Sequence, residues 1–316
     1  MIKPRKIGII GAGNVGPHVA LLLAAQGLAD EIVFYDIRQK KAAAEAMDIR
    51  DAVSYFPHHV SVYAGSMTDM KDADILVNAA GKRAFLWQTR PDLLEGSIRT
   101  CQDLVPRIAA SGFDGMIISI SNPCDIITAY LQHCLDWPVK KIIGSGTALD
   151  SARLQMQLSE QLHISRRSLT AYLLGEHGDS SMIPWSHVTA SGKPVLDLVR
   201  EKPDLYHMDP PDVILDKVHQ GGYIENADKE CTEFGVASAV CELIRAILHD
   251  EHKILPCSVR LENLYGAPSC FASVPVRLGA GGVEDIPEMS LTEAETAAFR
   301  HSAEVILQYF HWALSL

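Results

Sequence analysis

A glycine-rich turn near the N-terminus constrains the fold of this chain more than any other feature. The turn, Gly11-Ala-Gly13-Asn-Val15-Gly16, follows a β-branched run at residues 6–10 and opens a helical pattern at residues 17–26. The next predicted strand, residues 31–35, is followed at once by Asp36. A strand, a turn with this glycine spacing, a helix and a downstream acid together are typical of a unit that binds a dinucleotide.

Each part of this turn has a physical role in such a unit. Gly11 would permit the tight turn, Gly13 would let the backbone approach a pyrophosphate, and Gly16 would let the helix pack on the strand. The Asp36 carboxylate would accept hydrogen bonds from the ribose hydroxyls and repel a 2′-phosphate, which favours NAD over NADP. An incidental glycine-rich loop is the alternative, and the strand–turn–helix context disfavours it. The predicted cofactor-binding residues are Gly11, Gly13, Val15, Gly16 and Asp36.

The first half of the chain alternates β-branched runs with helical patterns, which predicts a parallel sheet covered by helices on both faces. Further strands are expected at residues 31–35, 60–63, 75–79, 115–120 and 141–144, and helices at residues 39–53, 92–111 and 124–134. The fold class is therefore α/β, with a Rossmann-type doubly wound sheet. Residues 1–145 are assigned to an NAD-binding domain.

After about residue 145 this alternation ends. The pattern predicts helices at residues 148–162, 212–226, 234–248 and 291–313, and strands at residues 169–174, 188–195, 257–261 and 273–278. This mixture indicates an α+β substrate and catalytic domain over residues 146–316. No linker separates the two halves, so we expect the site at their junction.

Composition limits the classes of binding partner and the cellular compartment that we expect for this protein. The 316 residues carry a formal net charge of −11, which argues against nucleic acid or anionic membranes as sequence-independent partners. The seven cysteines are odd in number and contain no C-x-x-C pair, which predicts reduced thiols and no metal site. The start of the chain lacks the pattern of a signal peptide, and the longest apolar run is too short to span a membrane. We expect a soluble cytoplasmic protein.

Three further motifs hold the candidate catalytic residues. Gly175-Glu-His177-Gly-Asp ends a predicted strand, Leu149-Asp150-Ser-Ala-Arg153 opens a predicted helix, and Ser121-Asn122-Pro123 ends another strand. Hydride transfer on a hydroxy acid needs a proton donor that titrates near neutrality, a group that orients it and a cation for the carboxylate. His177 and Asp150 suit the first two tasks, and Arg153, one helical turn from Asp150, suits the third. Taken singly, each residue is better explained by a structural role.

Together, GAGNVG with YD, SNP, LDSAR and GEHGD resemble the L-lactate/malate dehydrogenase family, and the resemblance covers essentially the whole chain. It is closest to the L-lactate and L-2-hydroxyisocaproate dehydrogenases, largely through the stretch SGFDGMIISISNPCDIITAYLQH. The resemblance implies reversible hydride transfer between NADH and a small 2-oxo acid, in a homo-oligomer, tetramer or dimer. It gives His177 as proton donor and acceptor with Asp150 as its partner, and Arg153 as the residue that binds the substrate carboxylate. It also implies that Asn122 contacts nicotinamide and substrate, and that Thr232 lines the pocket.

A loop that begins at Gly81, itself a candidate cofactor contact, aligns with the mobile active-site loop of this family. By resemblance, Arg90 polarises the substrate carbonyl when the loop closes. The position that is Gln in lactate and Arg in malate dehydrogenases is Ala84, flanked by Phe85, Leu86 and Trp87. A second substrate carboxylate would lack a partner there, which disfavours malate, and an apolar side chain larger than methyl would have room. Alternatively, Phe85 and Trp87 fill the space and leave a pyruvate-sized site.

Several alternatives remain open at this point. A malate dehydrogenase is the nearest enzyme, and a catalytically silent NAD sensor is the non-enzyme alternative, although His177, Asp150 and Arg153 are all retained. An NAD- and metal-dependent glycosidase would need a cysteine and histidine metal site, for which only Cys124 stands near the Asn-Pro turn. Fructose 1,6-bisphosphate activation is not expected, because the two cationic positions of that family site are Gln155 and Thr170.

Overall fold

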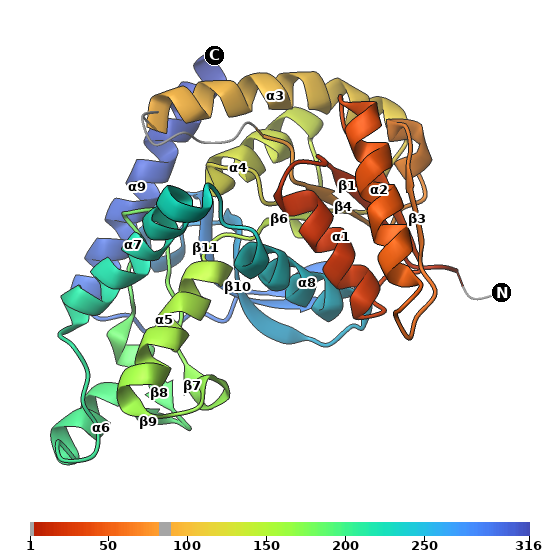
Figure 1. Ribbon diagram of the computed structural model, residues 1–316. Helices are drawn as coiled ribbons and strands as arrows, with labels where there is room; N and C mark the ends of the chain where they lie inside the picture. Colours follow the sequence, from red (N-terminus) through yellow and green to blue (C-terminus); the bar gives the residue numbers. More distant parts are fainter. Residues whose placement is uncertain (1–2, 82–89) are drawn as a thin grey trace.

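The computed structural model describes residues 3–81 and 90–316, and its centre is a nine-stranded sheet (Figure 1). The strand order is β12-β11-β10-β6-β5-β4-β1-β2-β3. The six strands from β3 to β6 are parallel and follow the order 3-2-1-4-5-6 of a doubly wound dinucleotide fold. Their bounds are β1 Lys6–Ile10, β2 Glu31–Tyr35, β3 Ser61–Ala64, β4 Ile75–Asn78, β5 Met116–Ser119 and β6 Ile142–Gly144.

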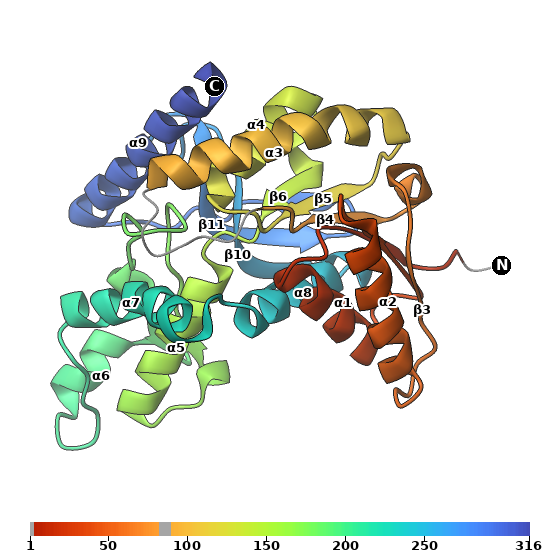
Figure 2. The same ribbon diagram turned by 45° about the horizontal axis from the view of Figure 1, so that its top comes forward.

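Helices cover both faces of this sheet, which explains why its central strands are buried along their whole length. In Figure 2, α3 and α4 lie above strands β4 to β6, while α1, α2 and α8 lie below the sheet. The Rossmann-type prediction is therefore confirmed. The helices are α1 Val15–Ala25, α2 Gln39–Val53, α3 Arg90–Ser111, α4 Cys124–Leu135, α8 Phe234–Leu248 and α9 Glu293–Ser315.

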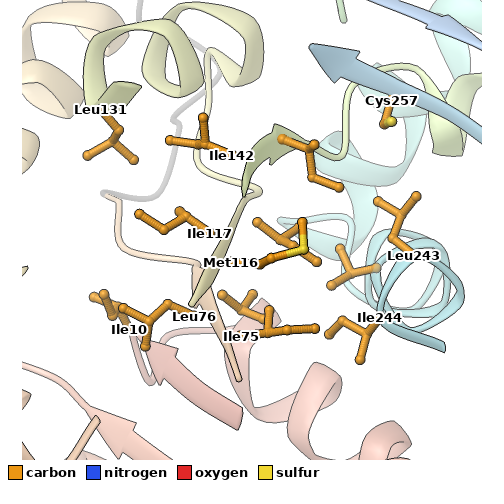
Figure 3. Packing of buried hydrophobic residues seen from close by; sticks show 14 of the residues in the cluster. Ile10, Ile75, Leu76, Met116, Ile117, Leu131, Ile142, Leu243, Ile244 and Cys257 are labelled. Carbon is orange, nitrogen blue, oxygen red and sulfur yellow. The ribbon is translucent and has the colours of Figure 1, made fainter. Parts of the chain in front are cut away.

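The second half of the chain extends the same sheet instead of building a separate one. β10 (Lys253–Leu261) runs antiparallel to β6, with Ser258 opposite Gly144, and pairs on its other side with β11 (Cys270–Gly279). β12 (Gly282–Asp285) completes the edge. One hydrophobic core therefore continues from the parallel strands into α8 and β10, as the packing of Ile75, Met116, Leu243, Ile244 and Cys257 shows (Figure 3).

A smaller lobe, the green and cyan part of Figure 1, has its own apolar cluster around Leu154, Leu158, Leu173 and Ile214. A three-stranded antiparallel sheet of order β7-β8-β9 packs there with three helices. The elements are α5 Ala148–Leu162, β7 Leu169–Thr170, β8 Thr189–Ala190, β9 Lys193–Pro194, α6 Val195–Glu201 and α7 Pro211–Lys229. Short 3₁₀ turns occupy Met67–Met70, Val139–Lys141, Arg166–Ser168, Trp185–His187 and Leu264–Gly266.

The sequence predictions for this lobe need correction. The strand expected at residues 169–174 ends at Thr170, and beyond it Leu174 and Gly175 make only single bridges, to Met182 and Ser273. The strand expected at residues 188–195 is a hairpin, because Ser191 and Gly192 turn the chain with positive φ. The helix α6 and the edge strand β12 were not predicted, because both are short and α6 follows directly on strand β9.

The glycines of the first turn give a test of this packing. A Cβ on Gly16 would overlap the Gly11 carbonyl oxygen, whereas a Cβ on Gly13 meets nothing within 4 Å. Overpacking of this kind costs about 1–3 kcal/mol. We therefore expect Gly16→Ala to lower the midpoint of thermal unfolding by several degrees, and the matched variant Gly13→Ala to leave it nearly unchanged. Equal midpoints for the two variants would contradict the close contact of α1 with β1.

Candidate active site

The glycine-rich turn forms a cradle whose shape fits a dinucleotide. Gly11 has a φ of 105° and donates its N–H to the Tyr35 carbonyl at 2.8 Å, which brings the ends of β1 and β2 together. The Asp36 carboxylate accepts the Ala12 N–H at 2.8 Å and the Arg38 N–H at 2.7 Å, so it is fixed beside the turn. Open space lies over Gly13, where the backbone can approach a ligand closely.

The N-terminus of α1 is directed to the same space. Val15 begins the helix, and the side chain of the preceding residue, Asn14, does not cap it but donates to the Cys231 sulfur at 3.0 Å. Uncapped backbone N–H groups at a helix N-terminus are a suitable site for a phosphate. The turn, the open space and the Asp36 carboxylate therefore fit the pyrophosphate and ribose of NAD, and these residues would hold it.

An acid–histidine pair, a buried Asp150 and a half-buried His177, lies at the carboxyl end of the sheet. His177 Nδ1 is 2.6 Å from Asp150 Oδ2, and Asp150 is 7% exposed. Asp150 stands in the first turn of α5, and the residue that precedes this helix, Thr147, is held by Leu173 and Ser273. The prediction that these two distant motifs meet is confirmed by the geometry.

The charges of this pair reinforce one another. The negative charge of Asp150 raises the pKa of His177 to about 9, although burial of the imidazole acts in the opposite direction. Burial alone would raise the pKa of Asp150, but the charges of His177 and Arg153 hold it below its usual value. At neutral pH the site therefore contains an imidazolium beside a carboxylate.

A second buried carboxylate, that of Asp125, contacts the backbone of His177. The His177 N–H donates to Asp125 Oδ2 at 2.7 Å, and burial raises the pKa of Asp125 to about 6. The sequence analysis missed this residue, although it stands only three positions after Asn122 in the stretch SNPCD. It fixes the main chain at the point from which the imidazole projects.

Arg153 lies on the same face of α5 as Asp150, as its spacing predicts. Its Nη1 is 3.2 Å from Asp150 Oδ1, and its Nη2 is 3.0 Å from Glu225 Oε2. Its Nε is buried and has no hydrogen-bond partner among the described residues. Glu225, which no sequence motif singled out, also accepts a hydrogen bond from Thr232 Oγ1 at 2.7 Å. Arg153 is therefore a candidate anion-binding residue.

A cavity of about 240 Å³ brings most of these residues together at the junction of α3, α4, α5, α7 and α9. His177, Asp150, Arg153 and Asn122 all line it. Thr232, which the resemblance placed in the pocket, is not among the lining residues and donates a hydrogen bond to Glu225 beside Arg153. Asn122 precedes a cis peptide bond to Pro123, and its carbonyl accepts from Ser97 Oγ at 2.6 Å. Further lining residues that the sequence did not indicate are Leu93, Ile126, Glu176, Asp179, His219, Tyr223, Asn226 and Tyr309.

The predicted active-site loop falls mostly outside the described residues. Ala84, Phe85 and Trp87 lie within residues 82–89, and the side chain of Arg90 is also outside the description although α3 begins at this residue. Gly81, the last described residue before the loop, has open space where a Cβ would stand. The roles of Ala84 and Arg90 therefore stay predictions.

The remaining sequence predictions concern metals and membranes. All seven cysteines are free, and Cys124 is buried, with its pKa raised to about 12 by burial, so its thiol does not offer a ligand to the cavity. In the part of the chain that the structure describes, one group could hold a metal ion, Asp250 with His252 and Glu284, and none of these residues lines the cavity. Within the same part, no helix has the length and apolar character needed to cross a membrane.

The origin of the high His177 pKa can be tested directly. Asp150→Asn removes the charge that favours the imidazolium most strongly. Burial and the charge of Arg153 then lower the pKa of His177, and only the weaker effect of Asp125 still raises it. We expect the pKa of His177 to fall from about 9 to its ordinary value or below, as measured by NMR titration of the imidazole nitrogens. The variant Asp228→Asn, on an exposed part of α7, serves as control and should leave the titration unchanged. A pKa near 9 in the Asp150 variant would disprove the assignment.

Comparison with known proteins agrees with this geometry. Residues 5–144 match the family model of the lactate/malate dehydrogenase NAD binding domain, and residues 147–312 match that of the lactate/malate dehydrogenase alpha/beta C-terminal domain. The L-lactate dehydrogenase of Fusobacterium nucleatum is 36% identical over 309 residues, which cover 98% of this chain and 97% of that protein.

Solved structures show the same likeness. The minor L-lactate dehydrogenase of Enterococcus mundtii, in its ligand-bound form, has a TM-score of 0.93 and 34% identity, covering 97% of this chain and 98% of its own. The lactate dehydrogenase of Cryptosporidium parvum, solved with lactic acid and nicotinamide adenine dinucleotide, has a TM-score of 0.94 and 25% identity over 100% of both chains. Fold, site geometry and both family models agree that this chain belongs to the lactate/malate dehydrogenase family.

Proposed function

We propose that the protein reduces small 2-oxo acids to L-2-hydroxy acids with NADH, using His177 as proton donor and Arg153 as the carboxylate-binding group. The chain is an NAD-dependent oxidoreductase that acts on a CH–OH group, as its L-lactate dehydrogenase relatives indicate. The observation that carries the proposed roles is the 2.6 Å contact of His177 with Asp150 at a cavity that also contains Arg153.

The proposed chemistry divides the work between cofactor and protein. Bound NADH supplies the hydride to the carbonyl carbon. Asp150 occupies Nδ1 of His177, which leaves Nε2 for the substrate oxygen. With a pKa of about 9, His177 is protonated at neutral pH and donates this proton to the carbonyl oxygen. In the reverse direction the neutral imidazole accepts the hydroxyl proton.

The Arg153 guanidinium fixes the other end of the substrate. A planar guanidinium can donate two parallel hydrogen bonds to a carboxylate, and the side chain is only 11% exposed, so the interaction is partly shielded from water. Asn122, at the edge of the same cavity, is proposed to contact both nicotinamide and substrate. Arg90 is proposed to polarise the carbonyl from the loop, with closure of the loop excluding water.

The two halves are proposed to act as an NAD-binding domain, residues 1–145, and a substrate and catalytic domain, residues 146–316. We further propose that the enzyme is cytoplasmic and forms a homo-oligomer, a tetramer or a dimer. The seven free cysteines, most of them buried, support a reducing compartment. The oligomer rests on family resemblance, and gel filtration tests it.

The proposed preference for apolar substrates rests on Ala84. A small apolar residue there leaves space for side chains larger than methyl and offers no cation to a second carboxylate. Each additional buried methylene contributes about 0.8 kcal/mol. We therefore expect 2-oxo acids of four to six carbons to match or exceed pyruvate in kcat/KM, measured by NADH oxidation, and oxaloacetate to be reduced more slowly.

Two variants serve as controls for this preference. Ala84→Arg should shift kcat/KM toward oxaloacetate, and Ala84→Gln should shift it toward pyruvate by refilling the space. If the wild-type enzyme favours pyruvate tenfold over 2-oxobutyrate, the roomy site is wrong and Phe85 or Trp87 fills it. A clear preference for oxaloacetate would instead support the malate dehydrogenase alternative, and NADH binding without turnover would support the sensor.

A further inference from the structure

The carboxylate of Glu225 contacts two residues that are proposed to bind the substrate, Arg153 and Thr232. Glu225 itself has no role in the proposed reaction. Its Oε2 is 3.0 Å from Arg153 Nη2 and 2.7 Å from Thr232 Oγ1. With Asp150 on Nη1, both terminal nitrogens of Arg153 therefore contact carboxylates of the protein itself. An acid at this position places a negative charge beside the cation that is proposed to bind the substrate.

The packing of α7 explains how this acid reaches Arg153. Gly221 and Gly222 bring the helix close to the guanidinium, with 3.1 Å between a Cβ built at Gly221 and Arg153 Cδ. Glu225 stands one helical turn beyond Gly221 and so projects from the same face. Gly222, Tyr223 and Asn226 of this helix line the cavity. Glu225 is not itself a lining residue, and it acts on the cavity through its contact with Arg153, which lines it.

The charges around the cavity leave little to balance another anion. Arg153 is the one arginine or lysine among the described lining residues, which also include the carboxylates of Asp150, Glu176 and Asp179. A 2-oxo monocarboxylate can take over the Arg153 contacts if the Glu225 side chain, 42% exposed, turns toward water. A dicarboxylate brings a second charge, which Glu225 would repel, because the cations of the described lining, Arg153 and the protonated His177, are both engaged by the 2-oxo acid group.

We infer that Glu225 is a specificity-determining residue, which selects against 2-oxo acids that carry a second negative charge and favours those with neutral or hydrogen-bond-donating side chains. The inference rests on the proposed reduction of 2-oxo acids. It differs from the role proposed for Ala84, because Glu225 acts by repulsion from beside Arg153 and not by the absence of a cationic partner.

The test compares two substrates of equal carbon number, oxaloacetate and 2-oxobutyrate, by kcat/KM for NADH oxidation. Glu225→Gln keeps the size and a hydrogen-bonding amide but removes the charge. We expect it to raise the oxaloacetate to 2-oxobutyrate ratio about tenfold or more, on the order of one nearby like charge at partial exposure, mainly through KM for oxaloacetate. Glu225→Asp, which keeps the charge, should stay close to the wild-type ratio.

Asp228→Asn removes a charge from an exposed position of the same helix and controls for net charge. Its ratio should stay within twofold of wild type. An unchanged ratio in a folded, active Glu225→Gln enzyme would overturn the inference, as would an equal shift in the Asp228 variant. Failure of the wild-type enzyme to oxidise NADH with any of the 2-oxo acids would instead overturn the proposed function.

Discussion

The contact between His177 and Asp150 requires four separate parts of the chain to be held in fixed positions relative to one another. Asp150 belongs to the start of α5, directly after the parallel sheet, whereas His177 lies in the segment beyond β7. The bridge from Gly175 to Ser273 on β11 and the hydrogen bond from the His177 N–H to Asp125 fix that segment from two sides. A carboxylate held in this way sets the protonation of the imidazole, because Asp150 is buried and its charge lies in direct contact with Nδ1.

The continuous nine-stranded sheet fixes these relative positions. Because β10 and β11 continue the sheet beside β6, only β10 separates the strand that contains Ser273 from β6, the strand that leads into α5. Strand β1 of the same sheet ends in the glycine-rich turn that fits NAD, and the cavity is lined by His177 and Asp150 themselves. In this family member, cofactor cradle and acid–base pair are therefore positioned by one continuous core and not by a flexible hinge between separate cores.

Much of this arrangement could be predicted from the sequence, because its signals are local. The bounds of β1, β2, α2, α5 and α8 follow from hydrophobic periodicity, and the spacing of Asp150 and Arg153 places both side chains on one helix face. The β7–β9 region was mispredicted because its backbone is set by turns and long-range bridges rather than by alternation. Glu225 has no local signal, since its meaning depends on the close approach of α7 to Arg153, which only the tertiary structure brings about.

The central claim is that the His177–Asp150 pair exchanges the proton that accompanies hydride transfer. The most direct measurement is the pH dependence of kcat/KM for pyruvate reduction by NADH and for L-lactate oxidation by NAD. Reduction needs protonated His177 and should fall as the pH rises through about 9, whereas oxidation needs the neutral imidazole and should rise through the same value. Profiles that change in the same direction, or that stay flat between pH 7 and pH 10, would contradict the account.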